Sequence, residues 1–224
     1  MGIHDGHRKR LKDRFLTHGL DNFDDLNALE LLLCYALPRQ DTNPIAHALL
    51  ERFGSLDAVL EASSDELQKV SGIGENAAAL LRLIPAVSRR YMLQKTPPGE
   101  VIASVTQAGR YLIPYFMYER EEVVYALLLD ARRRPICCTE IARGTVDAAD
   151  ISPRRLATLC LEKNASRVLL AHNHLSGNTS PSVEDEHTTR LLAEALRLVG
   201  IPLADHLIVA GYNYTSMKES GLIP

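Results

Sequence analysis

The sequence predicts an α+β chain with two domains, a helical N-terminal domain followed by a mixed-sheet α/β domain. Apolar residues recur at helical intervals in the first part of the chain, whereas short apolar runs typical of buried strands alternate with helical segments in the second part. The two textures meet at QKTPPGEV, where Pro97 and Pro98 end a helix and Gly99 permits a flexible exit. We therefore expect a helical domain at residues 1–94, a linker at 95–101 and the mixed-sheet domain at 102–224.

The spacing of apolar residues predicts the elements of both domains. In the first domain, short turns separate helical segments at residues 26–37, 43–54, 56–62, 64–70 and 75–93. In the second domain, helices are expected at 105–116, 152–164 and 183–199. Apolar runs such as VVYALLLD and RVLLA indicate strands, which we place at 123–130, 136–142, 167–171, 206–210 and 214–217. Together these elements predict a sheet of mixed strand directions packed against helices.

Composition excludes several classes of function. With 46% hydrophobic residues, the chain of 224 residues can bury a substantial core. Its net charge of -3 provides no overall attraction to nucleic acid, so any such contact has to be local. The four cysteines form no CxxC pair, which indicates reduced thiols, and no apolar run approaches the length of a membrane span. We expect a cytoplasmic protein without a membrane partner.

Two glycines in LQKVSGIGENAAALLRLI mark a tight turn between helical segments. Gly72 and Gly74 flank one apolar residue, and the helix that follows offers free N–H groups that can hold a phosphate. The arrangement resembles the helix-hairpin-helix motif of DNA repair proteins, which implies contact with a DNA backbone without reading its sequence. Glu75, however, would repel a phosphate at the start of that helix. DNA binding and a plain turn in a helical bundle therefore both remain open.

A His-x-His pair follows the apolar run RVLLA. Because side chains alternate along a strand, His172 and His174 are expected on the same side, where two imidazoles can chelate one Zn²⁺. Ser182 and Asp185 stand three residues apart at the start of a predicted helix. The same two residues also fit a capping box with Ser182 as the N-cap. Each piece thus has a purely structural interpretation, and the combined spacing is what indicates a metal site.

The segment HNHLSGNTSPSVED resembles the JAMM metalloprotease motif, also called MPN+ or JAB. Nearly the whole chain is similar to the RadC family, whose members are described as DNA repair proteins. The similarity runs through EREEVVYALLLD, EIARGTVDAADISPRRL, NASRVLLAHNHLSGN and GIPLADHLIVAG. It implies a JAB/MPN fold with one zinc ion per chain. His172, His174 and Asp185 would be the ligands, with a water in the fourth position.

The same resemblance implies two catalytic residues. JAMM enzymes use a glutamate on an upstream strand as general base and a serine that stabilises the oxyanion, and Ser182 matches that serine. For the glutamate we favour Glu122, with Glu121 adjacent and Glu140 as the competitor. The sequence departs from the family at Leu175, where a proline usually follows the second histidine. That change affects the stiffness of the loop and leaves the ligands intact.

The predicted activity is hydrolysis of an amide bond by a zinc-dependent peptidase or isopeptidase. The substrate would be a peptide or isopeptide whose identity the residues do not specify. An alternative is a DNA-binding accessory protein of repair or recombination, which would contact DNA through the helical domain and in which the zinc site is secondary. A metal-dependent nuclease is a further alternative, although a single His/His/Asp zinc site suits an amide better than a phosphodiester.

Overall fold

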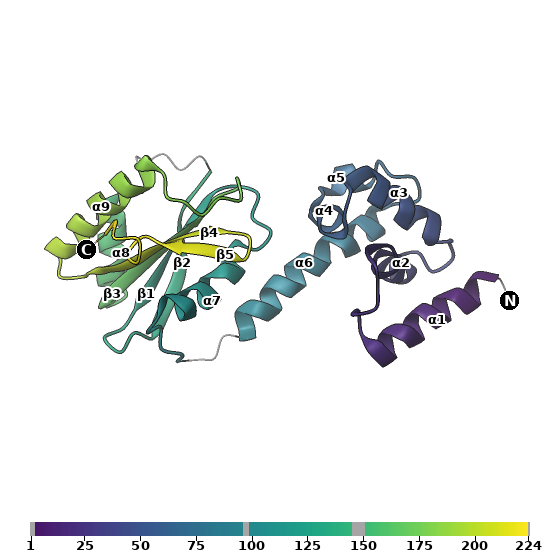
Figure 1. The fold of residues 1–224 in the computed structure, drawn as a ribbon, viewed down its shortest axis with the longest axis horizontal. Helices are drawn as coiled ribbons and strands as arrows, with labels where there is room; N and C mark the ends of the chain where they lie inside the picture. Colours follow the sequence, from purple (N-terminus) through teal and green to yellow (C-terminus); the bar gives the residue numbers. More distant parts are fainter. Residues whose placement is uncertain (1–2, 96–98, 145–150, 224) are drawn as a thin grey trace. The chain divides into compact units, whose positions relative to one another are not determined.

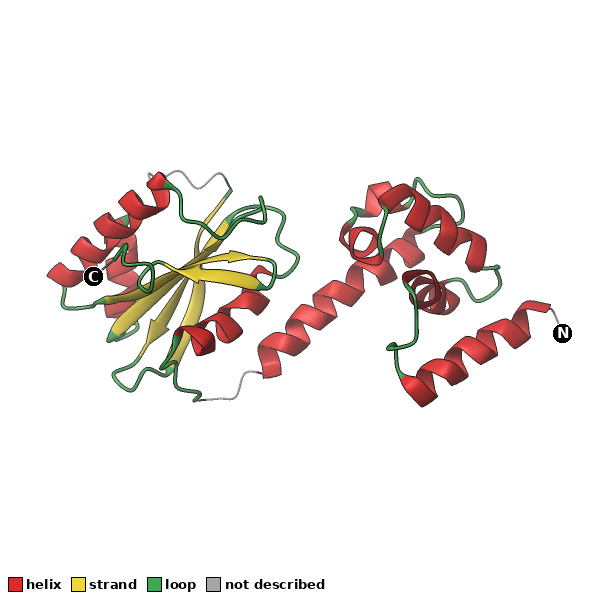
Figure 2. Ribbon diagram, viewed as in Figure 1, coloured by secondary structure: helices red, strands yellow, loops and turns green. Residues whose placement is uncertain are grey.

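A computed structural model describes residues 3–95, 99–144 and 151–223. The chain divides into two compact units, Met1–Arg90 and Tyr91–Pro224, and the boundary falls within helix α6. Part of the predicted linker, residues 96–98, lies outside the described residues. Figure 2 shows helices alone in the first unit and both helices and strands in the second. The α+β class, with a helical N-terminal region followed by a mixed sheet, is therefore confirmed.

The first unit is built from helices around one apolar core (Figure 1). Its fully buried side chains include Leu29, Leu33, Leu49 and Leu81. The helices are α1 (Ile3–His18), α2 (Asp25–Ala36), α3 (Asn43–Phe53), α4 (Leu56–Glu61), α5 (Ser64–Leu67) and α6 (Glu75–Lys95). Helix α1 was not among the predicted segments, because Leu11 alone of its described residues is buried and no apolar stripe marks it.

Packing requires a glycine at one position of the turn between α5 and α6. Gly72 adopts φ +92°, and a Cβ atom at this residue would lie 2.7 Å from Cδ1 of Ile45. Gly74 has open space at the corresponding position, and its carbonyl accepts the N–H groups of Ala77 and Ala78 at the start of α6. Gly72 is therefore required by the fold of this unit, whether or not the turn contacts DNA.

Replacing Gly72 by serine is expected to destabilise the first unit by about 1–2 kcal/mol, the cost of a left-handed conformation in a residue with a Cβ atom. The close approach of Ile45 adds to this cost. Hydrogen exchange of core amides such as Leu49 measures the effect. Gly74→Ser is the matched control and should change the same exchange free energies by less than about 0.5 kcal/mol, because serine is a good N-cap residue.

The described residues of the second unit form a five-stranded sheet in the order β2-β1-β3-β4-β5. Strands β3 and β4 run parallel and the other pairs are antiparallel, as the predicted mixed sheet requires. The strands are β1 (Val123–Leu129), β2 (Pro135–Arg143), β3 (Arg167–Asn173), β4 (Leu203–Ala210) and β5 (Asn213–Ser216). The parallel pair is made possible by helix α9 (Val183–Leu198), which crosses over between β3 and β4 (Figure 1).

Helices cover both faces of this sheet. Helix α7 (Val105–Phe116) packs on one face, while α8 (Pro153–Glu162) and α9 pack on the other. Alternate residues of β1 divide between the two cores: Val124 contributes to the α8/α9 side and Tyr125 to the α7 side. His172 of β3 pairs in register with Val124 of β1, which places both side chains on the α8/α9 face.

No helix among the described residues combines the length and the apolar character that a bilayer crossing requires.

Candidate metal centre

His172 and His174 meet at the end of β3. His172 is the penultimate residue of the strand and is 4% exposed, whereas His174 follows the strand and is tethered by its N–H to the carbonyl of Val209. The Nε2 atoms of the two imidazoles face each other at 2.9 Å. The two histidines thus approach one point with the same ring nitrogen.

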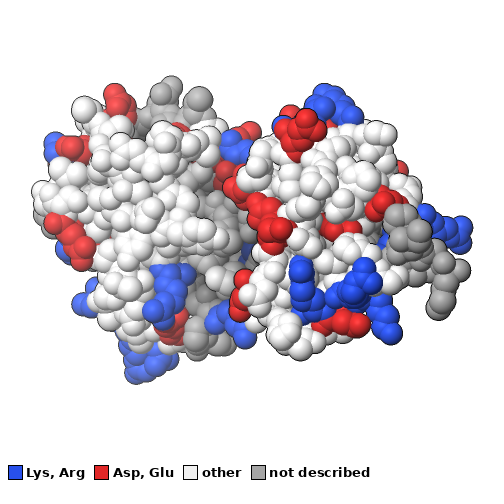
Figure 3. All heavy atoms as spheres, turned by 45° about the vertical axis from the view of Figure 1, so that its right-hand side comes forward, with Lys and Arg blue, Asp and Glu red and all other residues white. Residues whose placement is uncertain are grey.

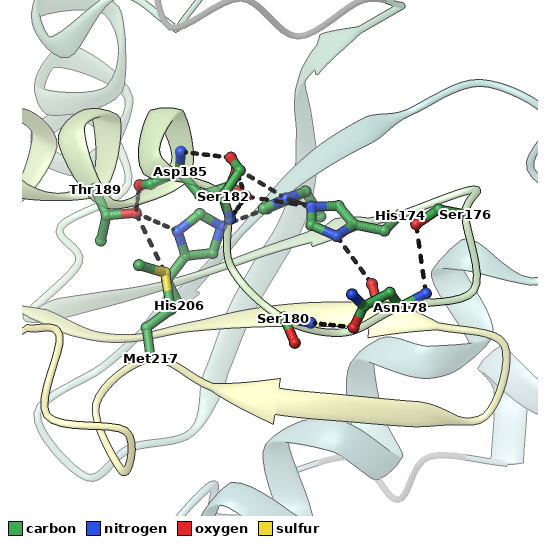
Figure 4. Close-up of polar contacts among 10 residues, drawn as sticks. His174, Ser176, Asn178, Ser180, Ser182, Asp185, Thr189, His206 and Met217 are labelled. Carbon is green, nitrogen blue, oxygen red and sulfur yellow. Dashed lines mark hydrogen bonds and ion pairs between the residues drawn. The ribbon is translucent and has the colours of Figure 1, made fainter.

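Asp185 reaches that point because α9 begins with a capping box. The Oγ of Ser182 accepts the N–H of Asp185, and the Asp185 carboxylate accepts both the N–H and the hydroxyl of Ser182. The carboxylate oxygens lie 3.1 Å from Nε2 of His172 and 3.2 Å from Nε2 of His174. The capping box is therefore real, and it orients the same carboxylate that faces the histidines (Figure 4).

The hydrogen bond at Nδ1 of His174 determines which tautomer the ring adopts. Its Nδ1 lies 3.0 Å from the carbonyl oxygen of Asn178, which can only accept a hydrogen bond. The proton of the neutral ring is therefore on Nδ1. The Nε2 atom of His174 consequently presents a lone pair to the cluster.

A chain of hydrogen bonds behind the cluster determines the tautomer of His172. Thr189 donates its hydroxyl to the carbonyl of Asp185 at 2.5 Å, so its oxygen accepts from Nδ1 of His206 at 2.6 Å. Nε2 of His206 then accepts from Nδ1 of His172 at 2.8 Å, which leaves the Nε2 of His172 with a lone pair as well. Burial and the neighbouring His172 hold the pKa of His206 well below its usual value, so this ring is neutral.

These donor atoms fit a divalent metal ion such as zinc. Two imidazole lone pairs and a carboxylate, all within 4.8 Å of one another, repel each other unless a cation lies between them. Bonds of about 2.0–2.2 Å to a tetrahedral zinc ion place ligand atoms roughly 3.3–3.6 Å apart, close to the separations of His172, His174 and Asp185. Although burial opposes ionisation, the hydrogen bonds from the N–H and hydroxyl of Ser182 favour the ionised carboxylate and lower the pKa of Asp185.

Replacing Thr189 by valine is expected to weaken zinc binding roughly 10–100-fold, as for other hydrogen-bonding partners of metal ligands. Valine keeps the shape of threonine but leaves Nδ1 of the buried His206 without an acceptor, which loosens the orientation of His172. Competition with a chromophoric chelator measures the affinity. Thr188→Val is the matched control, because Thr188 is also buried on α9 and makes none of these hydrogen bonds.

Comparison with known proteins shows the family of the chain. Residues 102–222 match the RadC-like JAB domain. The chain is 36% identical over 225 residues to UPF0758 protein FN0909 of Fusobacterium nucleatum, and 36% identical over 217 residues to UPF0758 protein SPO0054 of Ruegeria pomeroyi. Each alignment covers 97% of both chains. The chain belongs to the RadC family.

Membership of the RadC family confirms the predicted JAB fold for the second unit. The matched region contains the strand end, the polar loop and the α9 cap that form the candidate metal centre, while the first unit lies outside it. The two relatives nevertheless align with almost the whole chain, so both alignments extend into the helical region.

The RadC sheet separates the two main candidates for the general base. A small cavity beside His172 and Asp185 is also lined by Val124, and Glu122 lies two residues before Val124 on the strand approach. Alternation along the chain places Glu122 on this same face. Glu140 pairs in register with Tyr125, whose side chain belongs to the opposite, α7-facing core.

The two alternatives to Glu122, Glu140 and Glu121, lie close to the guanidinium of Arg143. Arg143 contacts Glu140 at 2.8 Å and Glu119 at 2.7 Å, and its distance to Glu121 is 3.9 Å. Among the described residues, we find no such partner for the carboxylate of Glu122. Glu140 is thus paired with Arg143 and Glu121 lies at the outer limit of such a contact, whereas Glu122 is outside this network.

Sequence reasoning did not assign Thr189 and Asn178 to the site. Thr189 lies four residues after Asp185, on the same side of α9, and this spacing is the signal that was available. Asn178 contributes only a backbone carbonyl, for which the sequence holds no signal. The leucine at position 175, where the family usually has proline, is 55% exposed and makes no contact with the cluster in any of these interactions.

Proposed function

We propose that the C-terminal unit binds one Zn²⁺ per chain and hydrolyses amide bonds as a peptidase or isopeptidase. The observation that supports this most directly is the pair of imidazole lone pairs and the ionised carboxylate directed at one point. His172, His174 and Asp185 would hold the ion. Bound there, zinc would supply a Lewis acid that polarises a carbonyl and makes water a better nucleophile.

In this proposal Glu122 is the general base. Its carboxylate would take a proton from the attacking water and later deliver that proton to the nitrogen of the leaving amine. The register of β1 and the cavity beside Val124 favour this assignment over Glu140. Because one carboxylate serves both proton transfers, its distance from the zinc ligands has to be maintained through the reaction.

Ser182 is proposed to stabilise the developing oxyanion with its hydroxyl. In the free protein that hydroxyl is donated to the carboxylate of Asp185 at 2.7 Å. It is exposed at the start of α9, so a rotation about its own side chain can redirect it toward a substrate oxygen. Ser182 would then alternate between orienting Asp185 and contacting the substrate.

A peptide-library screen tests the proposed hydrolysis. The zinc-loaded chain is incubated with the library, and mass spectrometry detects new termini in parallel samples with and without chelator. Cleavage that requires zinc and is lost in Glu122→Gln and His172→Ala supports the proposal. Cleavage that survives both substitutions, or a complete absence of zinc-dependent cleavage of peptide and isopeptide bonds, would contradict it.

The metal centre also bears on the nuclease alternative. Among the described residues, one group of three metal-ligating side chains is found, and it is the His172, His174 and Asp185 cluster. Phosphodiester hydrolysis commonly uses two metal ions about 3.5–4 Å apart. The single cluster therefore favours amide hydrolysis over a nuclease activity.

A second candidate function is backbone binding of DNA by the first unit. Lys9 and Arg10 are exposed on α1, and the glycine turn precedes α6, which supports such a contact. Other basic side chains have structural partners: Arg8 donates to carbonyls near the end of α2, and Arg82 to those of Glu61 and Ala62. Figure 3 shows Lys and Arg intermixed with Asp and Glu on the visible face of this unit.

Gel-shift titration with branched and single-stranded DNA at low and moderate salt tests this second function. Phosphate contacts require that affinity fall steeply as salt rises. Binding that is salt-dependent and weakened by a Lys9→Gln, Arg10→Gln double variant would support it. Absence of a shift even at low salt would exclude it.

A further inference from the structure

The residue between the two histidines, Asn173, extends the β1–β3 ladder with its side chain. The last backbone pair of that ladder is Val124 with His172. Beyond it, Oδ1 of Asn173 accepts the N–H of Val123 at 2.7 Å, and Nδ2 donates to the carbonyl of Glu121 at 3.0 Å. Asn173 is 5% exposed; its hydrogen bond with Val123 is buried, and the one with Glu121 is partly buried.

The two bonds bracket Glu122. One engages the peptide group that precedes it and the other the peptide group that follows it. From the opposite strand, the N–H of Gly144 donates to the carbonyl of Glu122 at 2.9 Å. The backbone of Glu122 is therefore held from both sides, although this residue lies just before β1 begins.

The chemistry at this position requires a carboxamide. Asparagine supplies one acceptor and one donor in a fixed plane, which match an N–H and a carbonyl two residues apart on an extended strand. Aspartate could accept from Val123 but could not donate to Glu121, and alanine could do neither. Asn173 lies between His172 and His174 in the chain. The segment that carries the two candidate metal ligands is therefore also hydrogen-bonded to the segment that carries Glu122.

We propose that Asn173 is a positioning residue that fixes Glu122 relative to His172 and His174. It touches neither the metal centre nor the substrate, and acts through the backbone of Glu122. Its effect on catalysis rests on the proposed function, in which Glu122 is the general base. Its effect on the local backbone does not, so the two parts can be measured separately.

Amide hydrogen exchange of the full chain tests the structural part. In Asn173→Ala, the N–H of Val123 should exchange faster by about tenfold or more, because its buried acceptor is gone. Asp130→Ala is the matched control: Asp130 also holds two backbone N–H groups, those of Arg132 and Arg134, but at the far end of β1. It should accelerate exchange at Arg132 and Arg134 and leave Val123 unchanged.

Zinc content and kinetics test the functional part. Asn173→Ala should still bind one zinc ion per chain, because no ligand has been removed. On a peptide that the parent chain cleaves, kcat should fall about tenfold or more with KM nearly unchanged, as expected for misplacement of a reacting group. In the Glu122→Gln background, Asn173→Ala should cause no further loss of kcat.

Several outcomes would overturn the proposal. Unchanged exchange at Val123 would show that Asn173 does not hold this segment. Faster exchange with unchanged kcat, or a further loss of kcat in the double variant, would show that Asn173 does not act through Glu122. Asn173→Asp keeps the shape and one of the two bonds, and it should give intermediate exchange at Val123 if the alanine variant fails to fold. If Glu122→Gln alone retains full activity, the proposed function fails, while the exchange experiment still decides the role of Asn173.

Discussion

Replacing His174 by alanine is expected to abolish stoichiometric zinc binding while the fold of the second unit persists. His174 supplies one of the three donor atoms, and its side chain is partly exposed, so its truncation leaves no large cavity in the core. Losing a direct ligand should cost more than the roughly 10–100-fold in affinity caused by losing a ligand's hydrogen-bonding partner. The measurement is zinc content by mass spectrometry after dialysis against a zinc-containing buffer.

His187→Ala is the matched control for this experiment. His187 lies on the same helix as Asp185, is exposed, and takes no part in the cluster, so its variant should keep one zinc ion per chain. A metal ion at a hundredfold excess over its dissociation constant stabilises the folded state by about 2.7 kcal/mol. Zinc should therefore raise the Tm of the parent and of His187→Ala, but not that of His174→Ala. A parent chain that holds no zinc after resupply, or equal zinc in both variants, would contradict the metal centre.

The grouping of the three candidate metal ligands could be predicted from local rules. Strand alternation places His172 and His174 on one side, and the capping box determines where the carboxylate of Asp185 lies at the start of α9. The carboxylate that completes the cap also faces His172, so the structural and functional interpretations of Ser182 and Asp185 do not exclude each other.

The hydrogen-bonding partners of the candidate ligands could not be predicted from the sequence, because they depend on how segments far apart in the chain pair in the sheet. His206 reaches His172 only through the parallel register of β3 and β4, which pairs His206 with Leu170 and His172 with Ile208. The choice between Glu122 and Glu140 depends on a register shift between Val124 and Tyr125 in the β1–β2 pair. A shift of one residue reverses the face of a side chain, and no sequence pattern marks this one.

The start of β4 also could not be predicted from the sequence. The apolar run predicts a strand that starts at His206, but β4 begins at Leu203 and includes the buried Asp205. That carboxylate accepts from the hydroxyl of Ser216 and the N–H of Lys218, both brought close by β5. A buried acid is tolerated where such partners exist, and its partners are visible only once the fold has formed.

Glu122→Gln is expected to lower kcat for amide hydrolysis by about 10²–10⁴-fold, the usual contribution of a positioned general base. Glutamine keeps the size and hydrogen-bonding shape of the side chain but cannot accept the proton. Zinc content should be unchanged, because Glu122 is not among the ligating side chains. Steady-state kinetics on a peptide from the screen, together with zinc content on the same sample, separate loss of the base from loss of the metal.

Glu140→Gln is the comparison that distinguishes the two acids. Glu140 forms an exposed ion pair with Arg143, and such pairs contribute only about 0–1 kcal/mol to stability, so the variant should fold and bind zinc normally. Because the register places Glu140 on the α7 face, its kcat should stay within about twofold of the parent value. If Glu140→Gln lost activity and Glu122→Gln retained it, the base would be Glu140. The β1–β2 register would then have placed the Glu140 side chain on the wrong face of the sheet, at the shift between Val124 and Tyr125.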